Sequence, residues 1–161
     1  YTTVGKRSGL PGNFLVSTCV AMPIIYGSVV ALDMIRLNVL IFASIAFLSN
    51  TGREITKGIA DVEGDKMKSV QTLAVRYGER AAAVVAALFY LLAVFLSPTP
   101  WLLNLVSPWF IPLVAITDLG LVASSLLLLQ DYSRENARRV KNIVLLWLIV
   151  GLLAFFIGAV R

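Results

Sequence analysis

Long apolar runs separated by short polar segments constrain the fold of this chain more than any other feature. Runs of about 20 residues have the length that a helix needs to cross the hydrocarbon of a bilayer. With 58% hydrophobic and only 14% charged residues, the chain also departs from the composition of soluble domains. The sequence therefore predicts an all-α, multi-pass transmembrane helical bundle with five spans, at about 13–32, 37–56, 80–97, 109–130 and 142–160.

The basic residues are divided unevenly between the two ends of these spans. Five spans place successive connections on alternate sides, which puts twelve Lys and Arg residues on one side and two on the other. Such a bias identifies the richer side as cytoplasmic. The net charge of +5 is then a consequence of membrane topology, and no basic soluble domain carries it. The expected partner is the lipid bilayer of the cell membrane, and nucleic acid is not expected.

The residues available for metal binding are restricted. The chain has no His, and its one Cys, Cys19, lies within an apolar run where packing is the expected role. Any metal would therefore be held by oxygen ligands.

The polar stretch from Asn50 to Gly78 contains the strongest candidates for chemistry. Arg53, Lys57, Asp61 and Asp65 follow one another at intervals of four residues, which places them near one face of a continuous helix. Two carboxylates one turn apart suit Mg²⁺, which often joins carboxylates to substrate phosphates, and the preceding cations suit a diphosphate. The alternatives are a solvated helix face for the carboxylates and interfacial anchoring for the cations.

Three further polar residues stand out close to, or within, the spans. Asn50 lies beside Arg53 at the membrane end of this stretch, and both are expected to face a cavity or the bundle interior. Glu54 is expected to neutralise Arg53 or Lys57. Asp118 is the one acid well inside a predicted span, where it is either functional or satisfied by a polar contact with Thr117 or a neighbouring helix.

Two segments carry a resemblance to a known family. REITKGIADVEGDKMKSVQTLAVRYG resembles the second aspartate-rich motif of the UbiA-type intramembrane prenyltransferases, and YTTVGKRSGLPGN resembles their tyrosine and lysine loop. The matching residues are Arg53, Glu54, Lys57, Asp61, Asp65, Thr72, Leu73 and Gly78 in the first segment, and Tyr1, Lys6, Arg7 and Gly12 in the second. The chain departs from the family pattern at Gly58, where a further aspartate is frequent, and at Ala74, where proline is usual.

The resemblance implies a larger architecture than this chain contains. The resemblance implies the fold of this family, a bundle of nine helices, so the five spans would be helices five to nine of that bundle. Residues 1–161 are accordingly expected to be the C-terminal half of a membrane prenyltransferase domain. A missing N-terminal half, with the first aspartate-rich motif, would complete the active site, and this half alone is expected to be inactive.

The function implied by the resemblance is Mg²⁺-dependent transfer of a polyprenyl group from a prenyl diphosphate to a lipophilic acceptor. Asp61 and Asp65 would be the catalytic metal ligands, and the diphosphate would be bound by Tyr1, Lys6, Arg7, Asn50, Arg53, Lys57 and Lys68. The runs GIADVEGD and YGERAA look most like archaeal digeranylgeranylglyceryl phosphate synthases, which implies geranylgeranyl diphosphate as donor and geranylgeranylglyceryl phosphate as acceptor. The alternatives are an aromatic acceptor such as 4-hydroxybenzoate, and a non-catalytic membrane subunit or transporter.

Overall fold

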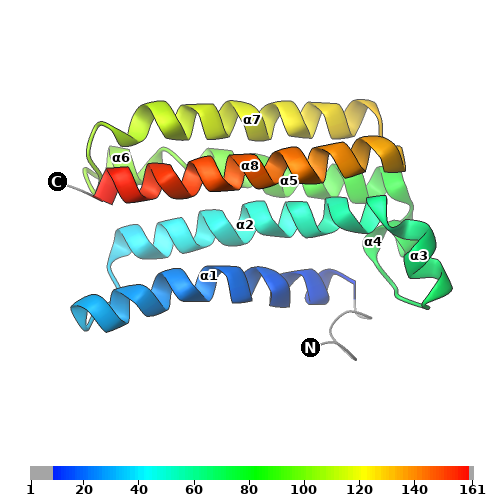
Figure 1. The fold of residues 1–161 in the computed structure, drawn as a ribbon, viewed down its shortest axis with the longest axis horizontal. Helices are drawn as coiled ribbons and strands as arrows, with labels where there is room; N and C mark the ends of the chain where they lie inside the picture. Colours follow the sequence, from blue (N-terminus) through cyan, green and yellow to red (C-terminus); the bar gives the residue numbers. More distant parts are fainter. Residues whose placement is uncertain (1–8, 160–161) are drawn as a thin grey trace.

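The computed structural model describes residues 9–159, and all regular structure in that range is helical. The helices are α1 (Leu10–Leu32), α2 (Leu37–Ala60), α3 (Val62–Met67), α4 (Leu73–Tyr77), α5 (Glu79–Leu96), α6 (Thr99–Leu102), α7 (Phe110–Gln130) and α8 (Arg134–Ala159). The long helices α1, α2, α5, α7 and α8 lie side by side, and α3 and α4 gather at one end (Figure 1). The predicted all-α bundle is confirmed.

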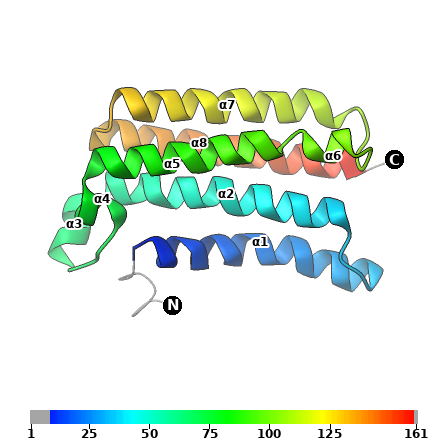
Figure 2. The same cartoon turned by 180° about the vertical axis from the view of Figure 1, so that it is seen from behind.

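Helix α2 is the element on which the others assemble. It packs against α1, α5 and α8, while α7 packs against both α5 and α8, so that α2, α5, α7 and α8 close a ring. Helix α1 lies outside this ring against α2, as the view from behind also shows (Figure 2). The order of the helices therefore leaves α1 and α8 as flanks on either side of α2.

Small residues allow α2 and α5 to approach closely. Helix α5 contains the buried small residues Ala82, Ala83, Ala86 and Ala87, and Gly52 of α2 lies against the α5 backbone at Ala86. Small residues at a helix interface are typical of membrane bundles, where close backbone packing replaces hydrophobic burial as the main attraction. Large apolar side chains lie on the outside instead, for example Phe95 and Leu119, which are 84% and 71% exposed. This outside-apolar arrangement is that of a membrane protein.

The number of apolar spans differs from the prediction of five. Within residues 9–159, four helical segments are long and apolar enough to cross a membrane: Leu10–Leu32, Glu79–Leu102, Phe110–Gln130 and Arg134–Ala159. The remaining expected span, 37–56, lies in α2, which has 24 residues but becomes polar from Ser49 onwards. Several of these polar residues are buried among the other helices, and this accounts for a polar half within a central helix.

The last helix begins earlier than predicted. The sequence predicts a charged turn before residue 142, but α8 already begins at Arg134. The Ser133 hydroxyl accepts a hydrogen bond from the Asn136 backbone N–H at 3.3 Å, as an N-terminal cap does. Glu135 and Arg139, four residues apart, form an ion pair at 2.6 Å, which also favours helix. The segment predicted as a charged turn therefore forms the N-terminal cap and the first turns of α8.

Candidate functional site

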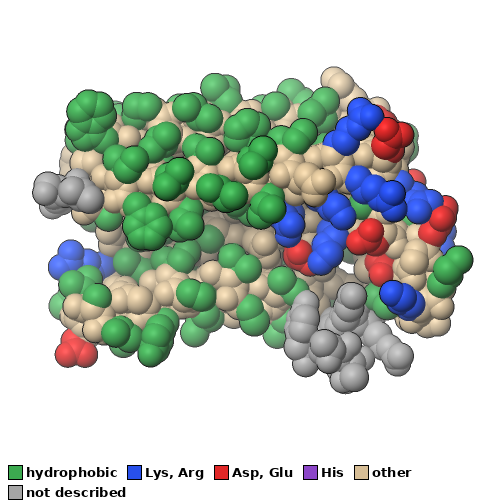
Figure 3. Space-filling model, in the orientation of Figure 1, with side chains coloured by type: hydrophobic (Ala, Val, Ile, Leu, Met, Phe, Trp, Pro, Cys, Tyr) green, Lys and Arg blue, Asp and Glu red, His purple; other side chains and the backbone are tan. Residues whose placement is uncertain are grey.

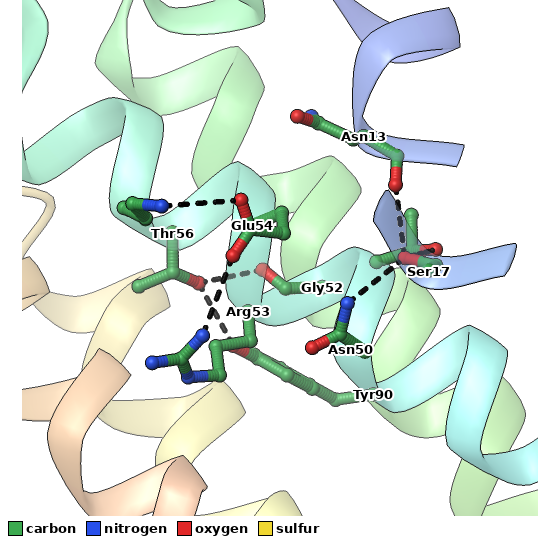
Figure 4. Close-up of polar contacts among 10 residues, drawn as sticks. Asn13, Ser17, Asn50, Gly52, Arg53, Glu54, Thr56 and Tyr90 are labelled. Atoms are coloured by element: carbon green, nitrogen blue, oxygen red, sulfur yellow. Dashed lines mark hydrogen bonds and ion pairs between the residues drawn. The ribbon is translucent and has the colours of Figure 1, made fainter. Parts of the chain in front are cut away.

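The polar half of α2 is fixed to α1 through one serine. Ser17 of α1 is fully buried, and its Oγ accepts hydrogen bonds from Asn50 Nδ2 at 3.2 Å and from Thr51 Oγ1 at 2.8 Å (Figure 4). Ser17 in turn donates to the backbone carbonyl of Asn13 at 2.9 Å. Asn50 is thus held in place before any ligand binds.

A second contact fixes the same part of α2 to α5. The Tyr90 hydroxyl lies 2.9 Å from Thr56 Oγ1, and Thr56 also donates to the backbone carbonyl of Gly52 at 2.9 Å (Figure 4). Tyr90 is fully buried, and its ring occupies the space that a side chain at Gly52 would need. The two anchors, one on α1 and one on α5, hold the intervening residue Arg53 at a defined position.

The cations predicted for diphosphate binding share one carboxylate. Glu54 Oε1 lies 3.3 Å from Arg53 Nη1, and Glu54 Oε2 lies 3.4 Å from Lys57 Nζ. The predicted pairing of Glu54 is therefore confirmed with both neighbours. The Arg53 Nε atom is buried and has no hydrogen-bond partner, whereas the Lys57 side chain is 46% exposed.

The predicted continuous helical stripe is interrupted at Asp61. Helix α2 ends at Ala60, Asp61 adopts φ −108° and ψ 13°, and α3 begins at Val62. Arg53 and Lys57 therefore lie on α2, Asp61 lies at the junction, and Asp65 lies on α3. The spacing nevertheless survives, because the Asp61 N–H donates to the Lys57 carbonyl at 3.0 Å and the Asp65 N–H donates to the Asp61 carbonyl at 2.9 Å. Asp61 and Asp65 are one turn apart and both are partly exposed.

This pair of carboxylates fits a magnesium ion that keeps some of its water. Within residues 9–159 no group of three or more Asp, Glu, Cys or His residues is arranged to hold a metal. Mg²⁺ is commonly bound by only one or two carboxylates together with substrate phosphates. Two partly exposed acids beside fixed cations therefore suit a metal that arrives with a phosphate ligand.

The remaining predicted diphosphate-binding residues are less informative. Lys68 is exposed at the C-terminal end of α3. Tyr1, Lys6 and Arg7 lie outside the described residues. The structure thus brings together Asn50, Arg53 and Lys57 on α2, and places Asp61 and Asp65 directly beyond them.

A cavity of about 570 Å³ lies beside Asn50 and Arg53, and both residues line it. Its walls come from α1, α2, α7 and α8 and are mostly apolar, with Pro23, Phe42, Phe110 and Phe155 among them. In the space-filling view the surface is hollowed between α8 and α1, and the charged side chains gather at the α3 end of the molecule (Figure 3). The volume is in the range of pockets that enclose small organic ligands.

The distance between the cavity and the acids follows from helix geometry. Asp61 lies two turns beyond Arg53, or about 12 Å along the axis at 1.5 Å per residue. Lys57 lies halfway between them. An elongated ligand with an apolar tail and an anionic head could therefore place its tail in the cavity and its head along Arg53, Lys57 and Asp61.

Two residues that line the cavity, Asp118 and Trp147, are not part of the matched motifs. Asp118 of α7 lines the cavity, and its Oδ2 accepts a hydrogen bond from Ser97 Oγ, at the end of α5, at 2.5 Å. The predicted contact with a neighbouring helix is thus found. Trp147 of α8 also lines the cavity and lies directly on Gly120 of α7, a contact that no sequence signal indicates.

Comparisons with known proteins agree with this architecture. Residues 1–149 match the UbiA prenyltransferase family. The digeranylgeranylglyceryl phosphate synthase of Archaeoglobus fulgidus is 41% identical over 159 residues, which cover 96% of this chain and 54% of that protein. The enzyme of the same name from Methanocaldococcus jannaschii is 33% identical over 161 residues, covering 100% of this chain and 56% of that protein.

A solved structure described as that of digeranylgeranylglyceryl phosphate synthase in membranes superposes with a TM-score of 0.88 at 33% identity. It covers 94% of this chain, and the chain covers 54% of it. The chain thus spans about half the length of the curated relatives and of the structure that it matches. Because the family match includes residues 1–149 of 161, the chain belongs to the UbiA prenyltransferase family.

Proposed function

We propose that the complete protein containing this chain transfers a geranylgeranyl group from geranylgeranyl diphosphate to geranylgeranylglyceryl phosphate. The observation that carries this proposal is the position of Arg53, at the boundary between an apolar cavity and the Asp61–Asp65 pair. A prenyl diphosphate has the same division into an apolar tail and an anionic head. The names of the similar archaeal proteins support the choice of acceptor.

The residues of this chain would act mainly by binding and orienting the donor. Arg53 and Lys57 would bind diphosphate oxygens, and Asn50, fixed by Ser17, would contact the head group from the cavity side. Asp61 and Asp65 would hold Mg²⁺, which supplies charge neutralisation for the leaving diphosphate. Lys68, Tyr1, Lys6 and Arg7 are proposed as further diphosphate-binding residues.

The proposed reaction breaks the bond between the allylic carbon and the diphosphate oxygen, and the electron pair stays on the diphosphate. The acceptor hydroxyl oxygen forms the new bond to that carbon, and its proton passes to the released diphosphate or to water. The apolar walls of the cavity would keep water from the reacting carbon, so that the acceptor and not water is prenylated.

We propose that residues 1–161 are the C-terminal half of the catalytic domain. The cavity is open between α1 and α8, and the chain corresponds to about half of each relative. A preceding half with the first aspartate-rich motif would close this opening and supply further metal ligands. The excess of Lys and Arg at the α3 end favours a cytoplasmic position for the site in the cell membrane.

The decisive experiment measures Mg²⁺-dependent release of diphosphate by the complete protein in lipid nanodiscs. Geranylgeranyl diphosphate is the donor, and the acceptors are geranylgeranylglyceryl phosphate and 4-hydroxybenzoate. Product is expected with the glycerol ether, and its formation should fall at least a hundredfold in Asp61→Asn and Asp65→Asn. Asp33→Asn is the matched control, because Asp33 directly follows α1, and the connection between α1 and α2 lies at the end of the bundle opposite α3 (Figure 1). Unchanged rates in both site variants would refute the metal role.

A further inference from the structure

Glu54 occupies an unusual place for an acid in a site that binds an anion. Its carboxylate bridges the two cations proposed to bind diphosphate, at 3.3 Å from Arg53 Nη1 and 3.4 Å from Lys57 Nζ. Its side chain is only 12% exposed, so the charge is screened little by solvent. An anionic ligand that reaches these cations must therefore approach a fixed negative charge.

The contacts of Glu54 are loose enough to be exchanged for a ligand. Hydrogen bonds between charged groups usually measure about 2.7–2.9 Å, and both contacts of Glu54 are longer. Arg53 Nε, which is buried, has no partner. Arg53 also lines the cavity, where a ligand can reach it. The cations are thus held near their places while part of their hydrogen-bonding capacity stays available.

We propose that Glu54 acts as a counter-ion that competes with the diphosphate product for Arg53 and Lys57 and thereby promotes its release. The inference rests on the proposed function. Cleavage of the carbon–oxygen bond leaves its electron pair on the diphosphate, which therefore gains negative charge relative to the substrate. A site made only of cations would bind this product more tightly than the substrate, and turnover would slow. The Glu54 carboxylate opposes the product more strongly than the substrate.

The sign of the effect separates this role from a structural one. If Glu54 only positions the cations, its neutralisation should weaken the binding of diphosphate. If Glu54 competes with the ligand, neutralisation should strengthen the binding. Removal of one charge a few ångströms from a multiply charged anion is expected to change affinity about tenfold, equivalent to about 1.4 kcal/mol.

The test is calorimetric titration of the complete protein with inorganic diphosphate in the presence of Mg²⁺. Glu54→Gln should lower the dissociation constant about tenfold, and in the transfer assay it should lower both KM for the prenyl diphosphate and kcat. Glu135→Gln is the matched control: Glu135 also pairs with an arginine at the cytoplasmic end proposed above, but its partner is Arg139 and not a cation proposed to bind diphosphate. Its dissociation constant should stay within twofold of the wild type.

Weaker or unchanged diphosphate binding in folded Glu54→Gln would overturn the inference while leaving the proposed function intact. Absence of diphosphate binding in the wild type would instead refute the proposed function, and this inference with it. Glu54→Asp keeps the charge and replaces Glu54→Gln if the latter does not fold. Its dissociation constant should remain within about twofold of the wild type, and tenfold tighter binding in this variant would also overturn the inference.

Discussion

Gly52 offers the sharpest test of how the site is held. A Cβ atom at this position would lie 2.7 Å from Tyr90 Cε1 and 3.0 Å from the backbone oxygen of Ala86. Neither neighbour can move easily, because one is the backbone of α5 and the other is a buried ring whose hydroxyl is held by Thr56 at 2.9 Å. Gly52→Ala should therefore push α2 away from α5.

The expected cost follows from two opposing terms. Ordinary contacts begin at 3.4 Å, so the neighbours would have to retreat by several tenths of an ångström. Overpacking of this kind costs about 1–3 kcal/mol. Replacing a helical glycine by alanine returns about 0.5–1 kcal/mol through helix propensity. Gly52→Ala should thus destabilise the protein by up to about 2.5 kcal/mol.

Gly27→Ala is the matched control, because Gly27 lies in α1 with no atom within 4 Å of its would-be Cβ. Thermal unfolding of the complete protein in detergent, followed by helical circular dichroism, should give a melting temperature below the wild type for Gly52→Ala. Gly27→Ala should melt at or above the wild-type temperature. Equal stability of the two variants would refute the close approach of α2 and α5 on which the position of Arg53 depends.

Three further substitutions test other parts of the structure. Tyr90→Phe keeps the buried ring but removes its hydrogen bond to Thr56, so thermal unfolding should show a loss of about 0.5–1.5 kcal/mol. Phe42→Ala enlarges the cavity at a cost of about 3–5 kcal/mol, and the KM for longer prenyl diphosphates should fall relative to that for geranylgeranyl diphosphate. Glu63→Gln breaks the ion pair of α3 with Arg134, and the loss of about 0.2–1 kcal/mol should be visible at low salt and disappear at high salt.

Much of the bundle could be predicted because apolar runs of membrane length have few alternative structures. The central role of α2 could also be anticipated, since buried polar groups such as Asn50 must face other helices in a membrane. The interruption at Asp61 could not be predicted, because the four-residue spacing of the charges suits one helix or two equally well. The early start of α8 was missed although Ser133 and Glu135 are ordinary signals of a helix N-terminus.

The candidate site was predictable where it depends on the chemistry of single residues, and unpredictable where it depends on contacts between helices. Arg53 was identified from its charge at a membrane boundary, and it lines the cavity. The contact of Trp147 with Gly120 joins residues of two different helices, so neither residue alone indicates that contact. The Ser17 contact with Asn50 spans 33 residues, and a serine within an apolar run gives no sign of its partner.

Gly58 is the position at which this chain departs from the expected acidic pattern, and the structure allows that departure to be reversed. A Cβ atom there would lie 3.5 Å from the Cβ of Thr72, which is an ordinary contact, so the backbone leaves room for the first atom of a side chain. In Gly58→Asp the new carboxylate would be three residues before Asp61, near the negative end of α2 and four residues after Glu54. These like charges and the helix dipole should make it less stable than Gly58→Asn by about 0.3–1 kcal/mol without Mg²⁺.

Saturating Mg²⁺ should reverse this order, since a third carboxylate beside Asp61 and Asp65 adds a ligand to the same ion. If the ion binds about tenfold more tightly, the stabilisation by Mg²⁺ rises by about 1.4 kcal/mol. Thermal unfolding in the presence of inorganic diphosphate, with and without Mg²⁺, measures both effects, since the site is expected to take the ion together with a phosphate ligand. Gly58→Asn has nearly the same shape without the charge and should show the wild-type response to Mg²⁺. If Mg²⁺ stabilised Gly58→Asp and the wild type equally, a magnesium site at Asp61 and Asp65 would be contradicted. A carboxylate one turn from Asp61 is expected to bind an ion held there and so to increase the stabilisation.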